Sequence, residues 1–572
     1  MTVGVAVTDS AARYTRSWWS VSIHRSLDAY PDTGPRMRYL SVVVLATIVT
    51  YFQAYAGSGV SPLILTHYGM SFSYFLYAQV IFGALGAGFA LIAARADRVG
   101  RANIVVVGLG CIAVLQLVIT TMPNKLSFVA VAGLQGAVEG AVLVCTPALV
   151  RDFTPQLKRA SAMGFWTLGP VVGSLAVSIV ANHTLKTWPS WQGQYYITGI
   201  TGGVMFLIAL FSLRELSPGL RTQLMVTGAD RALIQARARG LDPTTVVDPG
   251  EAIRRPWRQM VRWDLIGMSF GISVFLLVYF AAAGFFPIFL TTTFKSHGAL
   301  MTTQQANGID TWFWAFDAGA LILIGALSDR TRIRKPFMVI GALGAIGGTI
   351  WLERVTANPN TGYYTLVVLT SLTAAMLAVA YAPWMASYTE TVEAKNPALV
   401  ATGLAVWGYV LRVVVAVAAL LTPIVVSTVT PILNNSASIA KITASNPGIA
   451  VFEAHQALLT QLAADPHNTA LLNQAIKAVG VKGLQEVQQA EPALRQLAPK
   501  VASLESAIKA NPSRWQRWWW VCVAGEIAFI PTIFLARGRW SPRKAREDAE
   551  HHEQILQEEM ARLSSTEAWS AS

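Results

Sequence analysis

The sequence predicts an all-α membrane protein in which twelve transmembrane helices form two six-helix pseudo-repeats. Of its 572 residues, 53% are hydrophobic and only 13% are charged, whereas a soluble chain carries roughly a quarter charged residues. Apolar runs of membrane-spanning length recur along the chain. A charged Asp-Arg loop also occurs twice, at residues 96–101 and 328–335, in matching places in the two halves, as expected of an internally duplicated membrane protein.

Each predicted span has the length that a helix needs to cross the hydrocarbon layer, which is about 20 residues. Helices are expected because backbone groups in lipid must be satisfied within the segment. The segments lie at 39–58, 72–94, 103–122, 126–149, 162–181, 195–213, 265–290, 308–327, 337–355, 363–388, 399–430 and 516–536.

The short loops predict the orientation of the chain. Basic residues such as Arg98, Arg151 and Arg330 follow spans 2, 4 and 8. The short loops on the opposite side offer little beyond Lys125, Lys186 and Lys295. Because basic loops stay on the cytoplasmic side, we expect both termini in the cytoplasm and a multi-pass protein of the cell membrane. The polar N-terminal segment lacks the short apolar core of a signal peptide, so the first span is expected to target the chain.

Two polar segments divide the chain further. The segment before span 7 is predicted to be a cytoplasmic linker, and the long one before span 12 carries leucines at helical spacing. Pro466, Gly480, Gly483, Pro492 and Pro512 interrupt the latter, which predicts a small group of amphipathic helices outside the membrane. These helices either cap the outer mouth of the bundle, bind a partner, or only pack on themselves. The expected parts are an N-terminal segment 1–38, a first bundle 39–213, the linker 214–262, helices 7–11 at 263–430, the insertion 431–514, helix 12 at 515–537 and a tail 538–572.

Charge and cysteine content exclude several functions. The net charge of +13 resides mainly in loops between apolar spans, which suits the anionic inner surface of a lipid bilayer and not nucleic acid. Cys111, Cys145 and Cys522 lie in apolar spans without metal-ligand spacing. With no nucleotide-binding loop and no metal or other cofactor expected, a proton gradient is the expected energy source, and the protein is not expected to be an enzyme.

The duplicated loops also point to a family. The second loop, residues 325–336, reads Gly-Ala-Leu-Ser-Asp-Arg followed by Arg334-Lys-Pro, and this pattern, with six plus six spans, resembles the major facilitator superfamily. The resemblance covers roughly residues 38–430 and 515–537. The first loop departs from the pattern at Ala93, and the second at Arg332.

This resemblance implies a role for the loops in conformational change. Acidic and basic groups at helix ends can pair across helices or face a helix dipole, and in the family such loops steady one packing of the two halves. The residues to which this latch role carries over are Asp97, Arg98, Arg101, Asp329 and Arg330. The alternative is that they only determine topology.

Span 5 contains Gly169, Pro170 and Gly173, which predict a kinked helix that packs closely on a neighbour. The run resembles the Gly-Pro signature of the family's antiporters. A kink with a purely structural role is the alternative. In span 4, Ala132 stands where drug-proton antiporters of the family place an arginine.

Charged residues at mid-membrane depth are expensive and therefore functional candidates. Glu139 in span 4 and Asp317 in span 8 are the predicted proton-coupling residues, and Arg412 in span 11 is a predicted substrate-binding residue. The resemblance implies that all three can face a central cavity, while Glu526 in span 12 is peripheral. The alternative is a permanent internal ion pair.

Polar and aromatic side chains on the same predicted cavity helices suggest an organic solute with a flat or apolar part. The substrate-binding candidates besides Arg412 are Gln53, Tyr279, Tyr381 and Trp384, and Tyr51 and Tyr55 lie in span 1. Taken singly, each could equally serve helix packing.

These observations predict a secondary active transporter of a small organic solute, monomeric and proton-coupled, that works by rocking of two halves. Efflux by antiport and uptake by symport both remain open. A different class is a transporter-like sensor or assembly protein that binds an extracytoplasmic partner through residues 431–514.

Overall fold

The computed structural model describes residues 25–94, 100–153, 168–217, 256–393 and 399–536, except for Asp28 and Arg332. It also describes Leu220, Lys395 and six single positions between 540 and 554. Within these residues, eleven helical segments are long and apolar enough to cross a membrane. The helices that make them up are α2 (Thr33–Ala54), α5 (Phe72–Ala94), α6 (Arg101–Ile119), α7 (Lys125–Phe153), α10 (Trp191–Ser212), α15 (Trp263–Phe275) with α16 (Leu277–Thr293), α17 (Thr303–Thr331), α18 (Lys335–Thr356), α19 (Tyr363–Glu393), α20 (Val400–Val425) and α24 (Thr469–Thr532).

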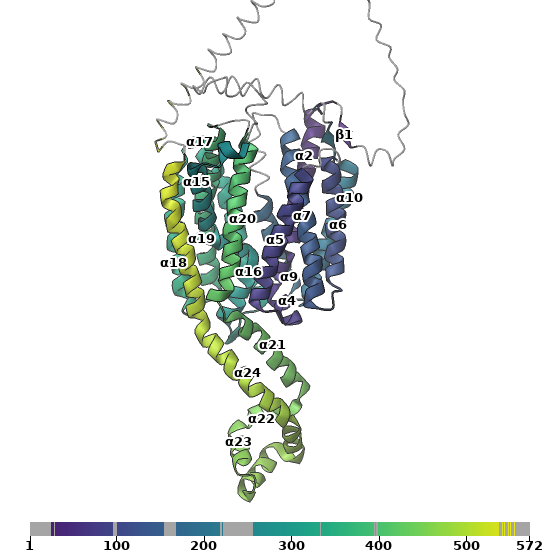
Figure 1. The fold of residues 1–572 in the computed structure, drawn as a ribbon. Helices are drawn as coiled ribbons and strands as arrows, with labels where there is room; N and C mark the ends of the chain where they lie inside the picture. The colour runs from purple at the N-terminus through teal and green to yellow at the C-terminus, as the bar shows by residue number, and fades with distance from the viewer. Residues whose placement is uncertain are drawn as a thin grey trace, which may run out of the picture.

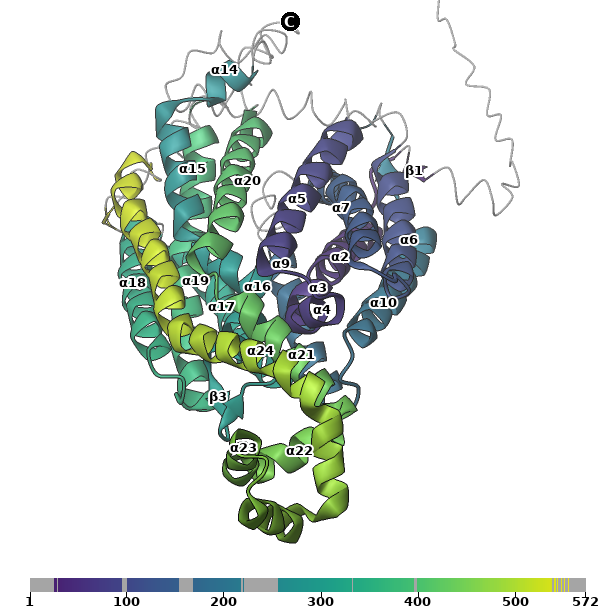
Figure 2. The same ribbon diagram turned by 60° about the horizontal axis from the view of Figure 1, so that its bottom comes forward.

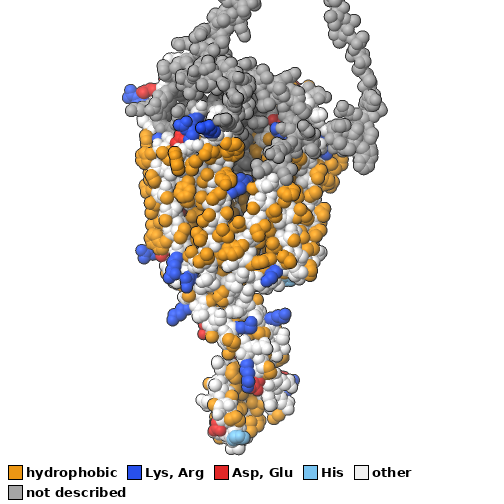
Figure 3. Space-filling model, viewed as in Figure 1, with side chains coloured by type: hydrophobic (Ala, Val, Ile, Leu, Met, Phe, Trp, Pro, Cys, Tyr) orange, Lys and Arg blue, Asp and Glu red, His pale blue; other side chains and the backbone are white. Residues whose placement is uncertain are grey.

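The fifth predicted span is described only in part. Helix α9 (Gly169–Thr184) covers its second half, and the residues before Leu168 lie outside the described part of the chain. The helical membrane fold is therefore confirmed, while the count of twelve stays a prediction. Figure 3 shows hydrophobic side chains spread over the face of the bundle, with most of the Lys and Arg side chains near its borders and one blue group within the face.

The helices form two bundles that lie side by side (Figure 1). The first contains α2, α5, α6, α7, α9 and α10, and the second contains α15 to α20 and the last part of α24. The bundles meet where α17 packs on α9, α20 packs on α5, and α16 packs on two short helices, α3 (Ala56–Gly59) and α4 (Ser61–Tyr68). We call the end of the bundles where α2 begins the terminal end, and the opposite end the distal end.

The first and seventh spans are both discontinuous. The first bends at Tyr55 and Val60 before Pro62 starts α4. The seventh breaks at Leu276, between α15 and α16, and again at the non-helical Phe285 two residues before Pro287. Proline cannot donate the backbone hydrogen bond that continues a helix, which accounts for the breaks near Pro62 and Pro287. Breaks in membrane helices occur where backbone is buried in protein, and here the broken segments pack on each other across the two halves.

Short strands and one buried arginine fix the terminal end of the first bundle. Strand β1 (Ser26–Leu27) pairs in parallel with β2 (Glu215–Leu216). Next to it, the Arg25 guanidinium donates to the carbonyl oxygen of Leu210 at 2.8 Å, and also to those of Ala209 and Leu213, so it caps the C-terminus of α10. Burial and the neighbouring Arg214 lower the pKa of Arg25, against the opposite effect of Glu215.

The remaining small elements lie between the long helices. Helix α14 (Pro256–Met260) precedes α15, and a 3-10 turn, η4 (Ile533–Leu535), follows α24. Strands β3 (Lys295–Ser296) and β4 (Ala299–Leu300) form an antiparallel hairpin, whose turn has positive φ at His297 and Gly298.

Residues 429–511 project from the distal end as a helical hairpin (Figure 1). It consists of α21 (Val429–Ser445), α22 (Pro447–Ala454), α23 (Gln456–Ala464) and the first part of α24. The expected boundary at 514/515 falls inside α24, which continues without interruption from the hairpin into the last span. Of the five expected breakpoints, Pro466 separates α23 from α24 and Gly480 bends α24 at φ 74°, but Pro492 and Pro512 lie within the helix. Packing of α24 against α21 and α22 offsets the hydrogen bonds that those prolines lack.

Candidate functional site

Asp317 and Tyr279 form the polar centre of the second bundle. Asp317 lies in the middle of α17 with no exposed surface, and the Tyr279 hydroxyl of α16 donates a hydrogen bond to its Oδ1. The other carboxylate oxygen, Oδ2, has no hydrogen-bond partner among the described residues. Tyr279 follows the break at Leu276, so the discontinuity of this span brings the hydroxyl to the carboxylate.

An aromatic column extends from this pair along α19. The ring of Tyr279 lies 6.5 Å from that of Tyr381. Tyr381 stacks at 6.4 Å on Trp384, which is 1% exposed, and Trp384 stacks at 4.9 Å on Tyr388. Trp407 of α20 contacts Tyr381 and Trp384 from the side. The predicted candidates Tyr279, Tyr381 and Trp384 therefore lie together.

Glu139 forms the corresponding centre of the first bundle. It lies on α7, and Nε2 of Gln135, one turn earlier, donates to its Oε1 at 2.7 Å. It lies near Tyr51 on α2, near Tyr55 at the bend that follows α2, and near Tyr195 on α10. Within the described part of the chain, neither Glu139 nor Asp317 forms an ion pair.

Tyr51 connects the two centres. It stacks on Tyr55 at 5.7 Å, and it lies within electrostatic reach of Arg412 as well as of Glu139. Tyr381 of the second bundle is also within its reach. Arg412 is itself exposed on α20, where its guanidinium donates to the carbonyl of Gly408 at 3.2 Å. Tyr51 thus lies near Glu139, Arg412 and Tyr381, and Tyr381 in turn lies near Asp317.

Gln53 lies apart from this cluster. Its side chain is 1% exposed and sits against Gly202 of α10, and Gln116 of α6 donates to its backbone carbonyl at 2.8 Å. It therefore lies in the interior of the first bundle, two residues from Tyr51 on a different face of the helix. Helical periodicity separates residues i and i+2 by about 200°, which accounts for the difference.

The small residues of span 5 allow α9 to approach α2 closely. A Cβ on Gly173 would meet the Tyr51 side chain at 2.6 Å, and one on Gly169 would meet Thr47 at 2.9 Å. Pro170 occupies the first turn of α9, where its missing N–H removes no helical hydrogen bond. The two glycines therefore let α9 pack against the face of α2 that carries Tyr51.

The first Asp-Arg loop forms its described contacts within the first bundle. Arg101 forms a 3.0 Å ion pair with Asp152 at the end of α7, and its backbone N–H donates to Glu215 of β2 at 2.8 Å. Asp97 and Arg98 lie outside the described residues.

The second loop repeats this arrangement with Arg334 at its centre. Arg334 is 2.8 Å from Asp329 and 3.0 Å from Glu390 at the end of α19, and it also donates to Ser328. Burial lowers the pKa of Arg334, but Glu390 and Asp329 raise it more. The predicted Arg330 is exposed and forms no ion pair with a described residue. The ion pairs of this loop are therefore made by Asp329 and Arg334, and the latch role expected of Asp329 and Arg330 stays a prediction.

The two halves contact each other through polar groups near the distal end. Asn307 of α17 donates to the Gly59 carbonyl at 2.7 Å, and Gln304 donates to Oδ1 of Asn182 on α9 at 2.5 Å. Phe72 at the start of α5 packs against Phe285 and Trp515 of the second half. Every hydrogen bond described between the halves lies towards this end, so the structure is closed distally.

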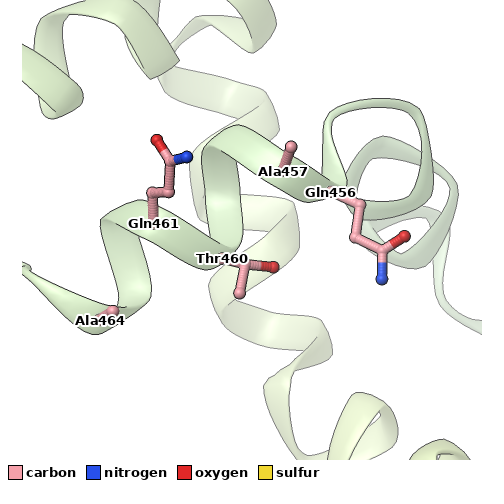
Figure 4. A pocket seen from close by; sticks show the side chains of 5 residues that line it. All are labelled: Gln456, Ala457, Thr460, Gln461 and Ala464. Carbon is pink, nitrogen blue, oxygen red and sulfur yellow. The ribbon is translucent and has the colours of Figure 1, made fainter.

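A shallow pocket elsewhere is unrelated to this site. It lies on α23 in the projecting hairpin, lined by Gln456, Ala457, Thr460, Gln461 and Ala464 (Figure 4). Figure 4 shows these side chains spread along one short helix. None of them is titratable, and the pocket offers no chemistry for a reaction.

The family model of the Major Facilitator Superfamily matches residues 43–419, about two thirds of the chain. The chain belongs to the Major Facilitator Superfamily. The expectation of a multi-pass transporter fold, and not an enzyme, is confirmed at the level of this family.

Individual relatives match over shorter stretches. The efflux pump radE of Floropilus chiversii is 27% identical over 197 residues, which are 33% of this chain and 36% of that protein. A bicyclomycin resistance protein homologue of Haemophilus influenzae is 26% identical over 157 residues, 27% of this chain and 37% of that protein. The matches thus span little more than a third of the length of these curated relatives.

A solved structure supports the same fold over most of the chain. A bacterial homologue of the human lysosomal transporter Spinster, in an inward-facing and unoccupied conformation, matches 90% of this chain and 100% of that one, at a TM-score of 0.53 and 15% identity. This superfamily member therefore shares the fold of that protein.

Sequence reasoning left Tyr51 out of the selected site although it lies near Glu139, Arg412 and Tyr381 in this superfamily member. The signal available for it was its spacing of four residues from Tyr55, which places both rings on one helix face. Phe72, Phe285 and Trp515 were also missed, because contacts between residues that distant in sequence leave no local pattern.

Proposed function

We propose that the protein is a secondary active transporter that moves a small organic solute, coupled to protons, by rocking of its two halves. The observation that carries this proposal is a pair of carboxylates without an ion-pair partner among the described residues: Asp317, with no exposed surface, in one half and the half-buried Glu139 in the other. Burying an ionised carboxylate without a cationic partner is expensive. A group that is sealed in one packing of the halves and hydrated in the other is suited to bind a proton and release it.

The aromatic column and Arg412 support an organic solute as cargo. Tyr279, Tyr381, Trp384 and Trp407 offer flat apolar surface, and the Nε1 groups of both tryptophans have no partner among the described residues. An incoming solute with a hydrogen-bond acceptor could satisfy them. The guanidinium of Arg412 is suited to bind carboxylate and phosphate groups and would favour an anionic group on the solute or pair with Glu139.

Efflux by proton antiport is the direction that we propose. The relatives named as an efflux pump and as a resistance protein homologue and the close packing of Gly169 and Gly173 on α2 support it. Uptake by symport is the second candidate, favoured by Ala132 in the place where drug-proton antiporters carry an arginine. We further propose that the protein is a monomer in the cell membrane with the terminal end in the cytoplasm, where Arg101 and Arg334 lie.

Purified protein in proteoliposomes under an imposed pH gradient tests the proposal. A panel of flat organic solutes, anionic and neutral, is scored for movement with and against the proton flow. Proton-driven movement of one class is expected, with antiport distinguished from symport by the direction of solute flow. Absence of any pH-driven transport across the panel, by protein shown to be folded and inserted, would contradict proton coupling.

Three carboxylate variants assign the coupling residues. We expect Glu139→Gln and Asp317→Asn to lose pH-driven transport while retaining solute exchange at equal pH. Glu526→Gln is the control, because Glu526, like Asp317, has no exposed surface but lies between α24 and α18, where it accepts a 2.7 Å hydrogen bond from Thr349. Full pH-driven transport in the Glu139→Gln, Asp317→Asn double variant would contradict the assignment of these two residues to proton coupling.

A sensor or assembly protein that uses the projecting hairpin is the alternative of another class. Replacing residues 446–491 by a short linker keeps the base of the hairpin and removes its tip. Retained transport would make the tip dispensable for transport. The alternative would be supported if the unmodified protein transports nothing and the variant without the tip no longer binds an external partner.

A further inference from the structure

The base of the projecting hairpin is joined rigidly to the second bundle through Asn511. This residue of α24 has no exposed surface. Its side-chain Nδ2 donates to the Thr292 carbonyl at 2.9 Å at the end of α16, and its Oδ1 accepts from Thr428 at 2.6 Å, just before α21. One buried amide therefore ties together α24, the seventh span and the start of α21. Removal of the Asn511 amide or of the Thr428 hydroxyl would leave a buried polar group without its hydrogen bond.

The hairpin itself is built to transmit movement. Ile449 of α22 packs with Ala490 and Leu497 of α24 in a small apolar core. Backbones come close where Gly448 meets α24 at Glu486, and Asn435 of α21 donates to Ser503 of α24 at 3.1 Å. Because α24 also continues into the last span, the hairpin and the second bundle form one connected body.

This body crosses over to the first bundle at the distal end. The backbone N–H of Phe72 donates to the Thr430 hydroxyl at 2.9 Å, and the Asn434 side chain donates to the Met70 carbonyl at 3.4 Å. Val429 and Leu433 belong to the same buried apolar cluster as Met70 and Phe72. Figure 2 places α21 beside α4, in agreement with their packing.

We propose that the first turns of α21 are a clasp that holds the distal end closed and must release before the distal end opens. We call residues 429–434 the clasp. The proposal rests on the rocking movement in the proposed function. Its physical basis is that rocking separates α4 and the start of α5 from the second bundle, and the clasp is fixed to that bundle by Asn511. The contacts of Thr430 and Asn434 therefore cannot persist in a distally open state.

A reversible cross-link tests the clasp directly. In a background with Cys111, Cys145 and Cys522 replaced by alanine, the pair Met70→Cys, Asn434→Cys is joined by a short cleavable methanethiosulfonate cross-linker. This link crosses between the halves. The matched control is the pair Asn435→Cys, Ser503→Cys, which joins α21 to α24 inside the hairpin. We expect the first link to abolish transport until it is reduced and the control link to leave transport intact.

Backbone hydrogen exchange supplies a readout that needs no substrate. The first link is expected to slow exchange in α3 and α4 relative to the control link, because it suppresses distal opening. Unchanged exchange there with complete cross-linking would overturn the clasp. If the unmodified protein transports nothing but exchange responds as expected, the proposed function fails and the clasp stands.

A single substitution gives a second test without cross-linking. Thr430→Val keeps the shape of the side chain but removes the acceptor for the Phe72 amide, while Thr430→Ser retains it. We expect exchange at the Phe72 amide to be roughly tenfold faster in the valine variant, as for loss of one hydrogen bond, and near the original rate in the serine variant. Equal exchange in both variants would contradict the proposal.

Discussion

The guanidinium of Arg101 lies 3.0 Å from the carboxylate of Asp152, and this pair has a counterpart in the other half. There Arg334 lies 3.0 Å from Glu390. In each half, an arginine at the start of the third helix pairs with an acid at the end of the fourth. The duplicated loops therefore each brace one bundle, so that each half can move as a unit.

The two braces are expected to differ in strength. Asp152 is 8% exposed and Glu390 is 46% exposed. In double-mutant cycles with alanine, we expect a coupling of about 1–3 kcal/mol for Arg101–Asp152, since hydrogen bonds to charged groups reach about that value when buried. For Arg334–Glu390 we expect about 0.2–1 kcal/mol, as for exposed pairs. Unfolding in detergent micelles measures both. Equal couplings would show that exposure does not decide their strength.

The hydroxyl of Tyr279 is expected to matter for coupling. Tyr279→Phe leaves the buried Asp317 without its one hydrogen bond from a described residue. We expect roughly 10- to 100-fold slower pH-driven transport, because a hydrogen bond to a charged group is worth about 1.5–3 kcal/mol. The control is Tyr409→Phe, since Tyr409 is 68% exposed on α20. Wild-type rates in Tyr279→Phe would remove Asp317 from the coupling pathway.

The close packing of α9 on α2 is expected to be sensitive to one methyl group. Gly173→Ala places a Cβ 2.6 Å from the Tyr51 side chain, and overpacking of this kind costs about 1–3 kcal/mol. We expect a lower melting temperature and weaker transport. Gly83→Ala is the control, because a Cβ there meets no atom within 4 Å. If both variants melt alike, the approach of the two helices is looser than described.

Gln53 is expected to be dispensable for transport. Both polar atoms of its side chain are buried without a hydrogen-bond partner among the described residues, so Gln53→Leu removes groups that gain nothing from burial. We expect unchanged solute selectivity and a stability equal to or above that of the original protein. Altered selectivity with an unchanged melting temperature would return Gln53 to the binding site.

Several site residues could be predicted because their type and depth are informative without a fold. Glu139, Asp317 and Arg412 stand out since charge in an apolar span is rare, and in the structure each of them lies near Tyr51 or Tyr381. Gln53 lies apart from these residues, because a polar residue in a span can point into a bundle interior as well as towards the other half. Arg334 was missed for a related reason, since the choice among four nearby basic residues depends on where Glu390 lies.

The sequence alone determined the helical membrane fold, its division into two halves and the family, because hydrophobic length and the repeated Asp-Arg loops are local properties of the chain. Only the tertiary structure decided which side chains meet. The Tyr279–Asp317 hydrogen bond depends on the breaks at Leu276 and Phe285, and the clasp depends on α24 running unbroken through Pro512. Both arise from packing between segments tens to hundreds of residues apart, which outweighs the local preferences that a sequence pattern records.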